Sequence, residues 1–134
     1  MTNNSLKNFQ EEISILKNKY DINSSSIPYF DKATALEVIN QRDFNNYNME
    51  FQIYFEDNYY NYIYIEAGRN PNPRILCRTK DIDELKYCAL KNILNYTADL
   101  EARKKCMNKH VIMFNLFNEI NKVYALKYAN EYSL

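Results

Sequence analysis

The feature of this chain that most constrains its fold is a pair of segments in which the type of side chain alternates. The second of them ends next to the only glycine of the chain. From Tyr47 to Phe55, and again from Tyr59 to Ala67, aromatic and branched residues recur at every second position. This period predicts half-buried β-strands, and the Asp57-Asn58 pair between them predicts a turn. After Gly68, a proline-containing connection leads to a short third strand over residues 74–78. The sequence therefore predicts an antiparallel meander.

Helical periodicity appears on both sides of this meander. Apolar residues at spacings of three and four predict an amphipathic helix over residues 5–20, with an inner face of Leu6, Phe9, Ile13, Leu16 and Tyr20. Asp81 followed by Glu84 predicts a capping box at the start of a second helix, whose apolar stripe extends to Tyr96. We expect Asp99 to begin a longer third helix. Residues 31–46 fit a short helix or a strand, and this choice stays open.

The order of these elements predicts an α+β fold. We expect an N-terminal helix, an antiparallel sheet of three or four strands and two C-terminal helices packed on one face of the sheet. A length of 134 residues indicates a single domain that spans residues 1–134. No apolar run has the length of a signal peptide or a membrane span, so we expect a cytoplasmic protein without membrane contact.

Composition argues against nucleic-acid and nucleotide binding. The 17 Lys and Arg residues are balanced by 17 Asp and Glu residues, so the chain lacks a net positive field that would attract phosphates. A local basic patch at Arg103, Lys104, Lys105 and Lys109 stays open. A single glycine excludes the usual phosphate-binding loops. We therefore expect no nucleic-acid partner and no cofactor.

The side chains that most often carry chemistry are explained here by packing and capping. Cys77, Cys88 and Cys106 match no zinc spacing and lie in apolar patterns, which predicts buried thiols. His110, the only histidine, follows Cys106 by one turn on an apolar stripe, so packing is favoured over a Cys–His nucleophile.

Three carboxylates, Asp81, Asp83 and Glu84, gather at the predicted start of the second helix. Helix capping and the helix dipole account for them without a metal ion. We expect no catalytic residues and no metal site, and therefore a protein that is not an enzyme.

The 13 tyrosines suggest a surface for binding another protein. If the face with Ile63 and Ile65 packs on the helices, the alternate residues of the same strand form an outward tyrosine stripe. The predicted partner-binding residues are Glu50, Gln52, Tyr54, Tyr60, Tyr62, Tyr64 and Arg78. Two other interpretations stay open, namely tyrosines that pack inwards and stacking on single-stranded nucleic acid, which the balanced charge disfavours.

The second half of the chain contains a series of short motifs in a fixed order. They are Tyr62-Ile-Tyr-Ile-Glu-Ala-Gly68, Thr79 with Asp81-Ile-Asp-Glu-Leu85, Tyr87, Asp99 with Glu101 and Arg103, and Met113-Phe114. In the order and spacing of these motifs, residues 59–132 resemble immunity protein family 63, one of the bacterial families that neutralise polymorphic toxins. The chain departs from the family at Cys88-Ala89, where a bulky aromatic pair is usual.

The resemblance implies a cytoplasmic, non-enzymatic protein that binds a cognate toxin domain and blocks it in the producing cell. The toxin would be a contact-dependent or a secreted effector used in bacterial competition. The alternative function is an adaptor domain with an unrelated protein partner. A homodimer is also possible, because an exposed tyrosine face can pair with itself.

Overall fold

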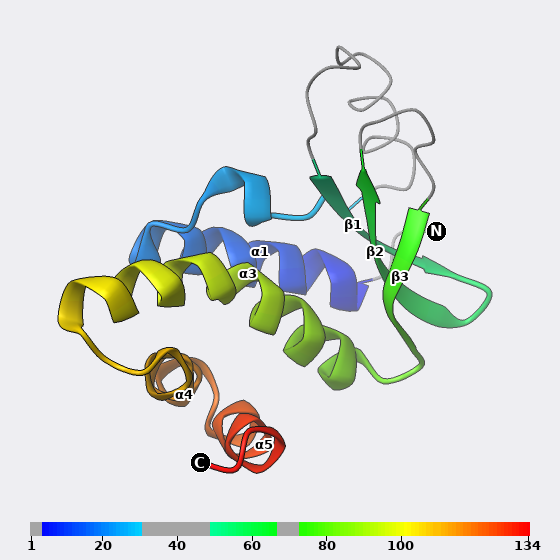
Figure 1. Ribbon diagram of the computed structural model, residues 1–134. Coiled ribbons are helices and arrows are strands. Elements are labelled where there is room, and N and C mark those ends of the chain that lie inside the picture. The colour runs from blue at the N-terminus through cyan, green and yellow to red at the C-terminus, as the bar shows by residue number, and fades with distance from the viewer. Residues whose placement is uncertain (1–3, 31–48, 67–72) are drawn as a thin grey trace. The chain divides into compact units, whose positions relative to one another are not determined.

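The computed structural model describes residues 4–30, 49–66 and 73–134 (Figure 1). Its elements are α1 (Asn4–Tyr20), η1 (Ser24–Ser26), β1 (Met49–Glu56), β2 (Tyr59–Glu66), β3 (Pro73–Thr79), α3 (Ile82–Lys105), α4 (Lys109–Ile120) and α5 (Lys122–Glu131). A helix, an antiparallel sheet of three strands and a set of C-terminal helices follow one another, which confirms the predicted α+β class. The open choice for residues 31–46 lies outside the described residues.

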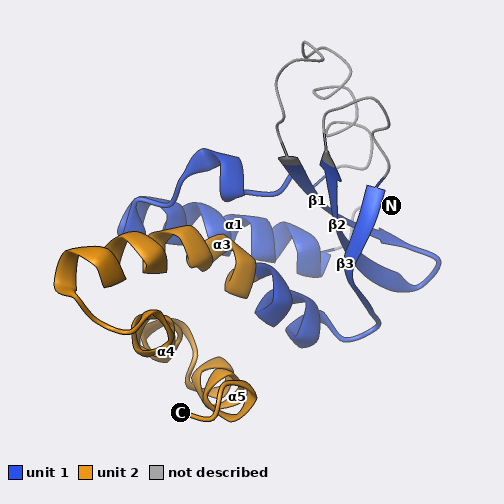
Figure 2. Cartoon of the chain, viewed as in Figure 1, with its two compact units in different colours: residues 1–89 blue, residues 90–134 orange. Residues whose placement is uncertain are grey.

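The chain forms two compact units, residues 1–89 and residues 90–134 (Figure 2). The first unit holds α1, the sheet and the first turns of α3, while the second holds the rest of α3 with α4 and α5. Helix α3 therefore runs through the boundary between the units. Within the described ranges, none of the helices combines the length and hydropathy needed to cross a membrane.

The sheet has the strand order β1-β2-β3, and both pairings are antiparallel. The turn at Asp57 and Asn58 has φ angles of 55° and 66°, the left-handed pair that a tight two-residue hairpin requires. Leu76 is the extra residue of a bulge in β3, because Tyr62 pairs with Cys77 and Ile63 pairs with Ile75.

The outer edge of β1 is partly covered by Tyr29, which forms a parallel bridge with Gln52. The Tyr29 amide donates to the carbonyl of Phe51 at 2.8 Å, and the Ile53 amide donates to the Tyr29 carbonyl at 2.7 Å. These two bonds satisfy backbone groups that an edge strand would otherwise present to solvent.

Helix α1 buries the face that its sequence predicts, with Leu6, Phe9 and Ile13 inside. Lys86 in the first part of α3 lies beside it. The Lys86 ammonium is 3.4 Å from the Glu12 carboxylate and 5.8 Å from the centre of the Phe9 ring. The stem of Lys86 therefore packs against α1 while its charged end reaches a carboxylate.

The start of α3 is held by a relay of hydrogen bonds through Thr79. The Thr79 hydroxyl accepts from the Asp81 amide at 3.0 Å and donates to the Glu84 carboxylate at 2.8 Å. The Asp81 carboxylate accepts from the Asp83 amide at 2.9 Å. The predicted helix start is correct. In a simple capping box the Glu84 carboxylate would accept directly from the Asp81 amide, whereas here the Thr79 hydroxyl lies between these two groups.

The predicted boundaries of the C-terminal helices are wrong. Helix α3 continues through Tyr96 and Asp99 to Lys105, and the remaining residues form two further helices where one was expected. No glycine or proline lies within α3, so nothing in its sequence forces a break near Tyr96.

The true breaks in this region lie at asparagines. The Asn108 side chain accepts from the His110 amide at 2.8 Å and caps α4. The Asn121 side chain accepts from the Val123 amide at 2.9 Å and caps α5. Asparagine is among the best N-cap residues because its short side chain satisfies an unpaired amide of the first turn.

Candidate interaction surface

The strand register separates the seven predicted partner-binding residues onto two faces of the sheet. Tyr60, Tyr62 and Tyr64 lie opposite Phe55, Ile53 and Phe51 of β1 and share a face with them. On the other face, Glu50, Gln52 and Tyr54 lie opposite Ile65, Ile63 and Asn61, and Arg78 lies opposite Asn61 from the β3 side. The structure therefore does not bring the seven residues together.

The expected outward tyrosine stripe is also wrong. Tyr62 is only 1 % exposed and stacks on Phe51 with ring centres 6.0 Å apart, and Tyr60 is buried as well. Tyr64 is half-buried. A central strand with aromatic residues on one face and isoleucines on the other offers both faces to a core, and this strand buries both.

The face that carries Ile63 has its own small apolar cluster. Ile63 and Ile65 are buried, and Tyr29 and Tyr54 pack against them. Glu50 and Gln52, two of the predicted binding residues, are buried on this face, with Gln52 only 1 % exposed. Of the predicted residues on this face, Tyr54 is half-buried and Arg78 is exposed, so these two remain accessible to a partner.

Arg78 and Tyr54 belong to an accessible part of this face, near the β1–β2 turn and along β3. We call it the Arg78 surface and define it by five residues: Tyr54, Tyr59, Ile75, Arg78 and Lys80. The pairings of Arg78 with Asn61 and of Ile75 with Ile63 place these two side chains on the Ile63 face. Ile75 is 65 % exposed, which is unusual for an isoleucine in a strand.

Two cationic side chains, Arg78 and Lys80, lie over the Tyr59 ring at the centre of the Arg78 surface. The Arg78 guanidinium carbon lies 4.3 Å from the centre of the Tyr59 ring, and the Lys80 ammonium lies 5.1 Å from it. Such contacts orient long side chains and are worth about 0.5–1 kcal/mol each at exposed sites. The sequence analysis missed Tyr59 and Lys80, although the hairpin register places Tyr59 diagonally across from Arg78.

Strand β3 adds a local positive charge to a chain with no net charge. Residues 73–80 contain Arg74, Arg78 and Lys80 but no acidic residue. Ile75 and Leu76 between them are 65 % and 42 % exposed. An exposed apolar pair flanked by arginines has the composition found at the cores and edges of protein interfaces.

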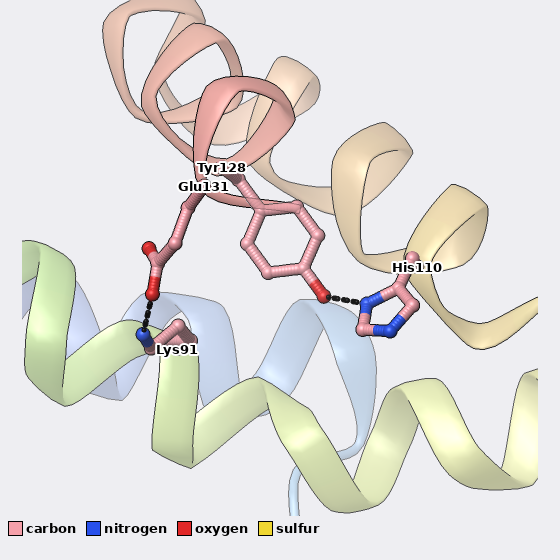
Figure 3. A network of polar contacts seen from close by, with 4 residues as sticks. All are labelled: Lys91, His110, Tyr128 and Glu131. Atoms are coloured by element: carbon pink, nitrogen blue, oxygen red, sulfur yellow. Dashed lines mark hydrogen bonds and ion pairs between the residues drawn. The ribbon is translucent and has the colours of Figure 1, made fainter. Parts of the chain in front are cut away.

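The second unit contains a polar cluster that joins its three helices (Figure 3). His110 of α4 meets Tyr128 of α5, with 2.7 Å between the imidazole Nδ1 and the phenol oxygen. Lys91 of α3 pairs with Glu131 of α5 at 2.6 Å, and its ammonium also lies 5.7 Å from the centre of the Tyr132 ring. The Tyr132 ring in turn stacks on His110 at 4.5 Å.

The pKa of the Tyr128 phenol is raised from 10.0 to about 12. The largest cause is burial, which disfavours the charged phenolate, and the neighbouring Tyr132 and Glu131 add to it. Tyr128 is protonated at neutral pH, as an ordinary tyrosine is, and the shift keeps it protonated at more alkaline pH. The cluster is suited to tying α5 to its two neighbours, because a neutral phenol and an imidazole make a stable hydrogen bond.

The expected neighbour relation between Cys106 and His110 is not found. Helix α3 ends at Lys105 and α4 begins at Lys109, so the two residues are not one turn apart on a single helix. The prediction of three buried thiols is correct for Cys77 but wrong for Cys106, which is exposed, while Cys88 is half-buried. Exposure alone makes Cys106 accessible to alkylating agents, so native reactivity of this thiol would not identify a nucleophile.

Among the described residues, no group of three or more His, Cys, Asp or Glu side chains is placed to hold a metal ion. In comparisons with known proteins, no family model, no curated protein and no solved structure matches the chain. The resemblance to immunity protein family 63 therefore stays a prediction that rests on the motif residues themselves.

Proposed function

We propose that this protein is a non-enzymatic immunity protein that binds a cognate bacterial toxin domain in the producing cell. The toxin would be blocked by occlusion of its active site or of its access to a target. The observation that carries the proposal is the Arg78 surface, which combines an oriented arginine, two tyrosines and an exposed isoleucine on one sheet face.

The residue types of this surface suit a protein partner. Arginine and tyrosine are enriched among the residues that contribute most to protein–protein affinity, because both cover a large area and keep a polar group for hydrogen bonding. Contact with Tyr59 restrains Arg78 and Lys80 before binding, which reduces the entropy lost when a partner docks. The positive charge would attract an acidic patch on the toxin.

The family resemblance supports the proposal independently of this surface. Thr79, Asp81 and Glu84 belong to the matched motif, and they form one hydrogen-bonded helix start. Tyr62, Leu85 and Tyr87, also in the motif, are buried. The motif residues thus serve folding in this chain. Members of a family built on such a scaffold could carry different binding residues on its surface.

The test is a calorimetric titration of the protein with the toxin domain encoded immediately upstream of its gene. We expect one-to-one binding with a nanomolar Kd, and at least tenfold weaker binding by the Arg78→Glu variant. Lys7→Glu is the matched control, because it makes the same charge change at an exposed position on α1 of the same unit.

Each result of this titration has a distinct meaning. If neither the wild type nor the variants bind a folded toxin domain, the immunity function is wrong and an adaptor with another partner becomes the better hypothesis. If the wild type binds and both variants bind equally well, the immunity function stands but the Arg78 surface is not the binding site.

A further inference from the structure

The outer edge of β3 differs from the opposite edge of the sheet. Tyr29 occupies part of the outer edge of β1 through two backbone hydrogen bonds. Strand β3 pairs with β2 on its inner side, and no strand in the described part of the chain pairs with its outer side (Figure 1). A strand in this position presents a row of amide and carbonyl groups that another strand can use.

The side chains of β3 make pairing with a second copy of this chain unfavourable. Each β3 segment carries Arg74, Arg78 and Lys80 and no acidic residue, so pairing of two copies would bring two such sets of cations together. Accumulated like charge disfavours such an assembly. Charged side chains on an edge strand are a common means by which proteins prevent such association. Arg74 and Arg78 would instead favour a strand that carries acidic residues at the positions opposite them.

The exposed apolar residues of β3 supply the rest of such a contact. Ile75 and Leu76 lie between the two arginines and project into solvent. Backbone pairing gives affinity in strand addition, and the alternate side chains give specificity. An incoming strand would therefore carry apolar residues between two acidic ones.

We infer that an extended acidic segment of the toxin adds to the sheet as a fourth strand, antiparallel to β3 along its outer edge. This inference rests on the proposed immunity function. The segment would carry two acidic residues, three or four positions apart, that face Arg74 and Arg78. The bulge at Leu76 places Arg74 and Arg78 on opposite faces of the sheet. The two acidic residues would be four positions apart if the incoming strand has a matching extra residue, and three positions apart if it does not.

The experiment is hydrogen–deuterium exchange of the full chain, free and bound to the upstream-encoded toxin domain. We expect the β3 amides that exchange fast in the free protein to become protected in the complex, because they would donate to the added strand. Docking of a toxin on the Arg78 surface through side chains alone would leave these amides in fast exchange.

A charge variant provides the second measurement. Arg74 lies on the face opposite to the Arg78 surface, so Arg74→Glu tests the edge and spares that surface. We expect about tenfold weaker toxin binding by Arg74→Glu, while Lys7→Glu keeps the wild-type affinity.

The outcomes separate the inference from the proposed function. Binding with protected β3 amides and a weakened Arg74→Glu variant supports strand addition. Binding without protection of β3 overturns strand addition and leaves the immunity function standing. If a folded toxin domain does not bind at all, the immunity function is overturned and strand addition by the toxin is overturned with it.

Discussion

At the scale of single residues, the position of a tyrosine decides its role in this protein. Tyr62 is buried in the sheet and stacks on Phe51. Tyr59 is half-buried and holds Arg78 and Lys80 over its ring. Tyr128 is buried in the helical unit and pairs with His110. The same side chain thus serves as core, as part of a surface and as a link between helices, because its ring is apolar and its hydroxyl is polar.

The raised pKa of Tyr128 predicts a loss of stability at alkaline pH. Below pH 10 the phenol is protonated in both the folded and the unfolded chain. Between pH 10 and about 12 the unfolded chain releases this proton while the folded chain retains it, since burial holds the pKa of Tyr128 at about 12. The free energy of unfolding should therefore fall as pH rises through this window, by roughly 3 kcal/mol at most from this group.

Urea unfolding at pH 8, 10 and 11 measures this effect. The Tyr128→Phe variant should be less stable at pH 8, because it lacks the bond to His110, but its stability should depend less on pH above 10 than that of the wild type. Tyr96→Phe removes an exposed tyrosine and serves as the control. Equal alkaline slopes for the wild type and Tyr128→Phe would contradict the assignment.

At the scale of elements, the start of α3 depends on one hydroxyl. Thr79→Val keeps the shape of the side chain but removes the group that accepts from the Asp81 amide and donates to Glu84. We expect the free energy of unfolding to fall by about 1–2 kcal/mol, as for the loss of a helix cap. Ser14→Ala is the control, because it also removes a hydroxyl bond, to the Gln10 carbonyl, at an exposed helix position. A Thr79→Val change as small as that of Ser14→Ala would show that the relay is dispensable.

The end of α3 offers a stabilising change. The Met107 amide donates to the Ala102 carbonyl at 3.0 Å, and Cys106 has a φ angle of 50°. This is the arrangement that normally places glycine just after a helix, since a side chain destabilises the left-handed conformation. Cys106→Gly should raise the free energy of unfolding by about 0.5–1 kcal/mol in urea titrations. Cys106→Ala, which keeps a β-carbon, should bring no such gain, and an equal gain in both variants would contradict the backbone explanation.

The elements differ in how far the sequence predicts them. Alternation over 47–55 and 59–67 locates β1 and β2 within two residues of their ends, because period two is a strong and local pattern. The helix breaks were missed because asparagine caps at Asn108 and Asn121 are weaker markers than glycine or proline.

The sequence was in principle sufficient to predict which residues of β1 and β2 share a face of the sheet. A two-residue turn at Asp57-Asn58 places even-numbered residues of β1 opposite odd-numbered residues of β2, which separates Glu50, Gln52 and Tyr54 from the tyrosines.

The burial of each face was not predictable from the strands alone. Both sides of β2 carry aromatic or branched residues, so the sequence does not indicate which side meets the core. Tyr60 and Tyr62 are buried on one side of the strand, while on the other side Ile63 and Ile65 are covered by Tyr29 and Tyr54. Tyr29 reaches that position through a bridge between segments more than twenty residues apart, and periodicity reports only local order.

At the scale of the whole molecule, balanced charge conceals an uneven distribution. The chain has no net charge, yet residues 73–80 carry three cations and no acid. Net charge therefore indicates little about binding, while the local field at β3 acts within about 8 Å at physiological salt. A partner that approaches this strand meets a positive surface, although the molecule as a whole does not attract it from a distance.

The same distribution predicts that the free protein is a monomer, in contrast to the homodimer that an exposed tyrosine face would allow. Tyr60 and Tyr62 are buried and cannot form such a face. Pairing of two β3 edges would also bring together two segments that each carry Arg74, Arg78 and Lys80 without an acidic residue. Sedimentation velocity at micromolar to 0.1 millimolar concentration should give a single species of 16.1 kDa. Any concentration-dependent dimer would contradict this expectation. Protection of the β3 amides in that dimer would show that the positive charge does not prevent edge pairing, whereas a dimer without such protection would place self-association elsewhere and leave the β3 edge open to another strand.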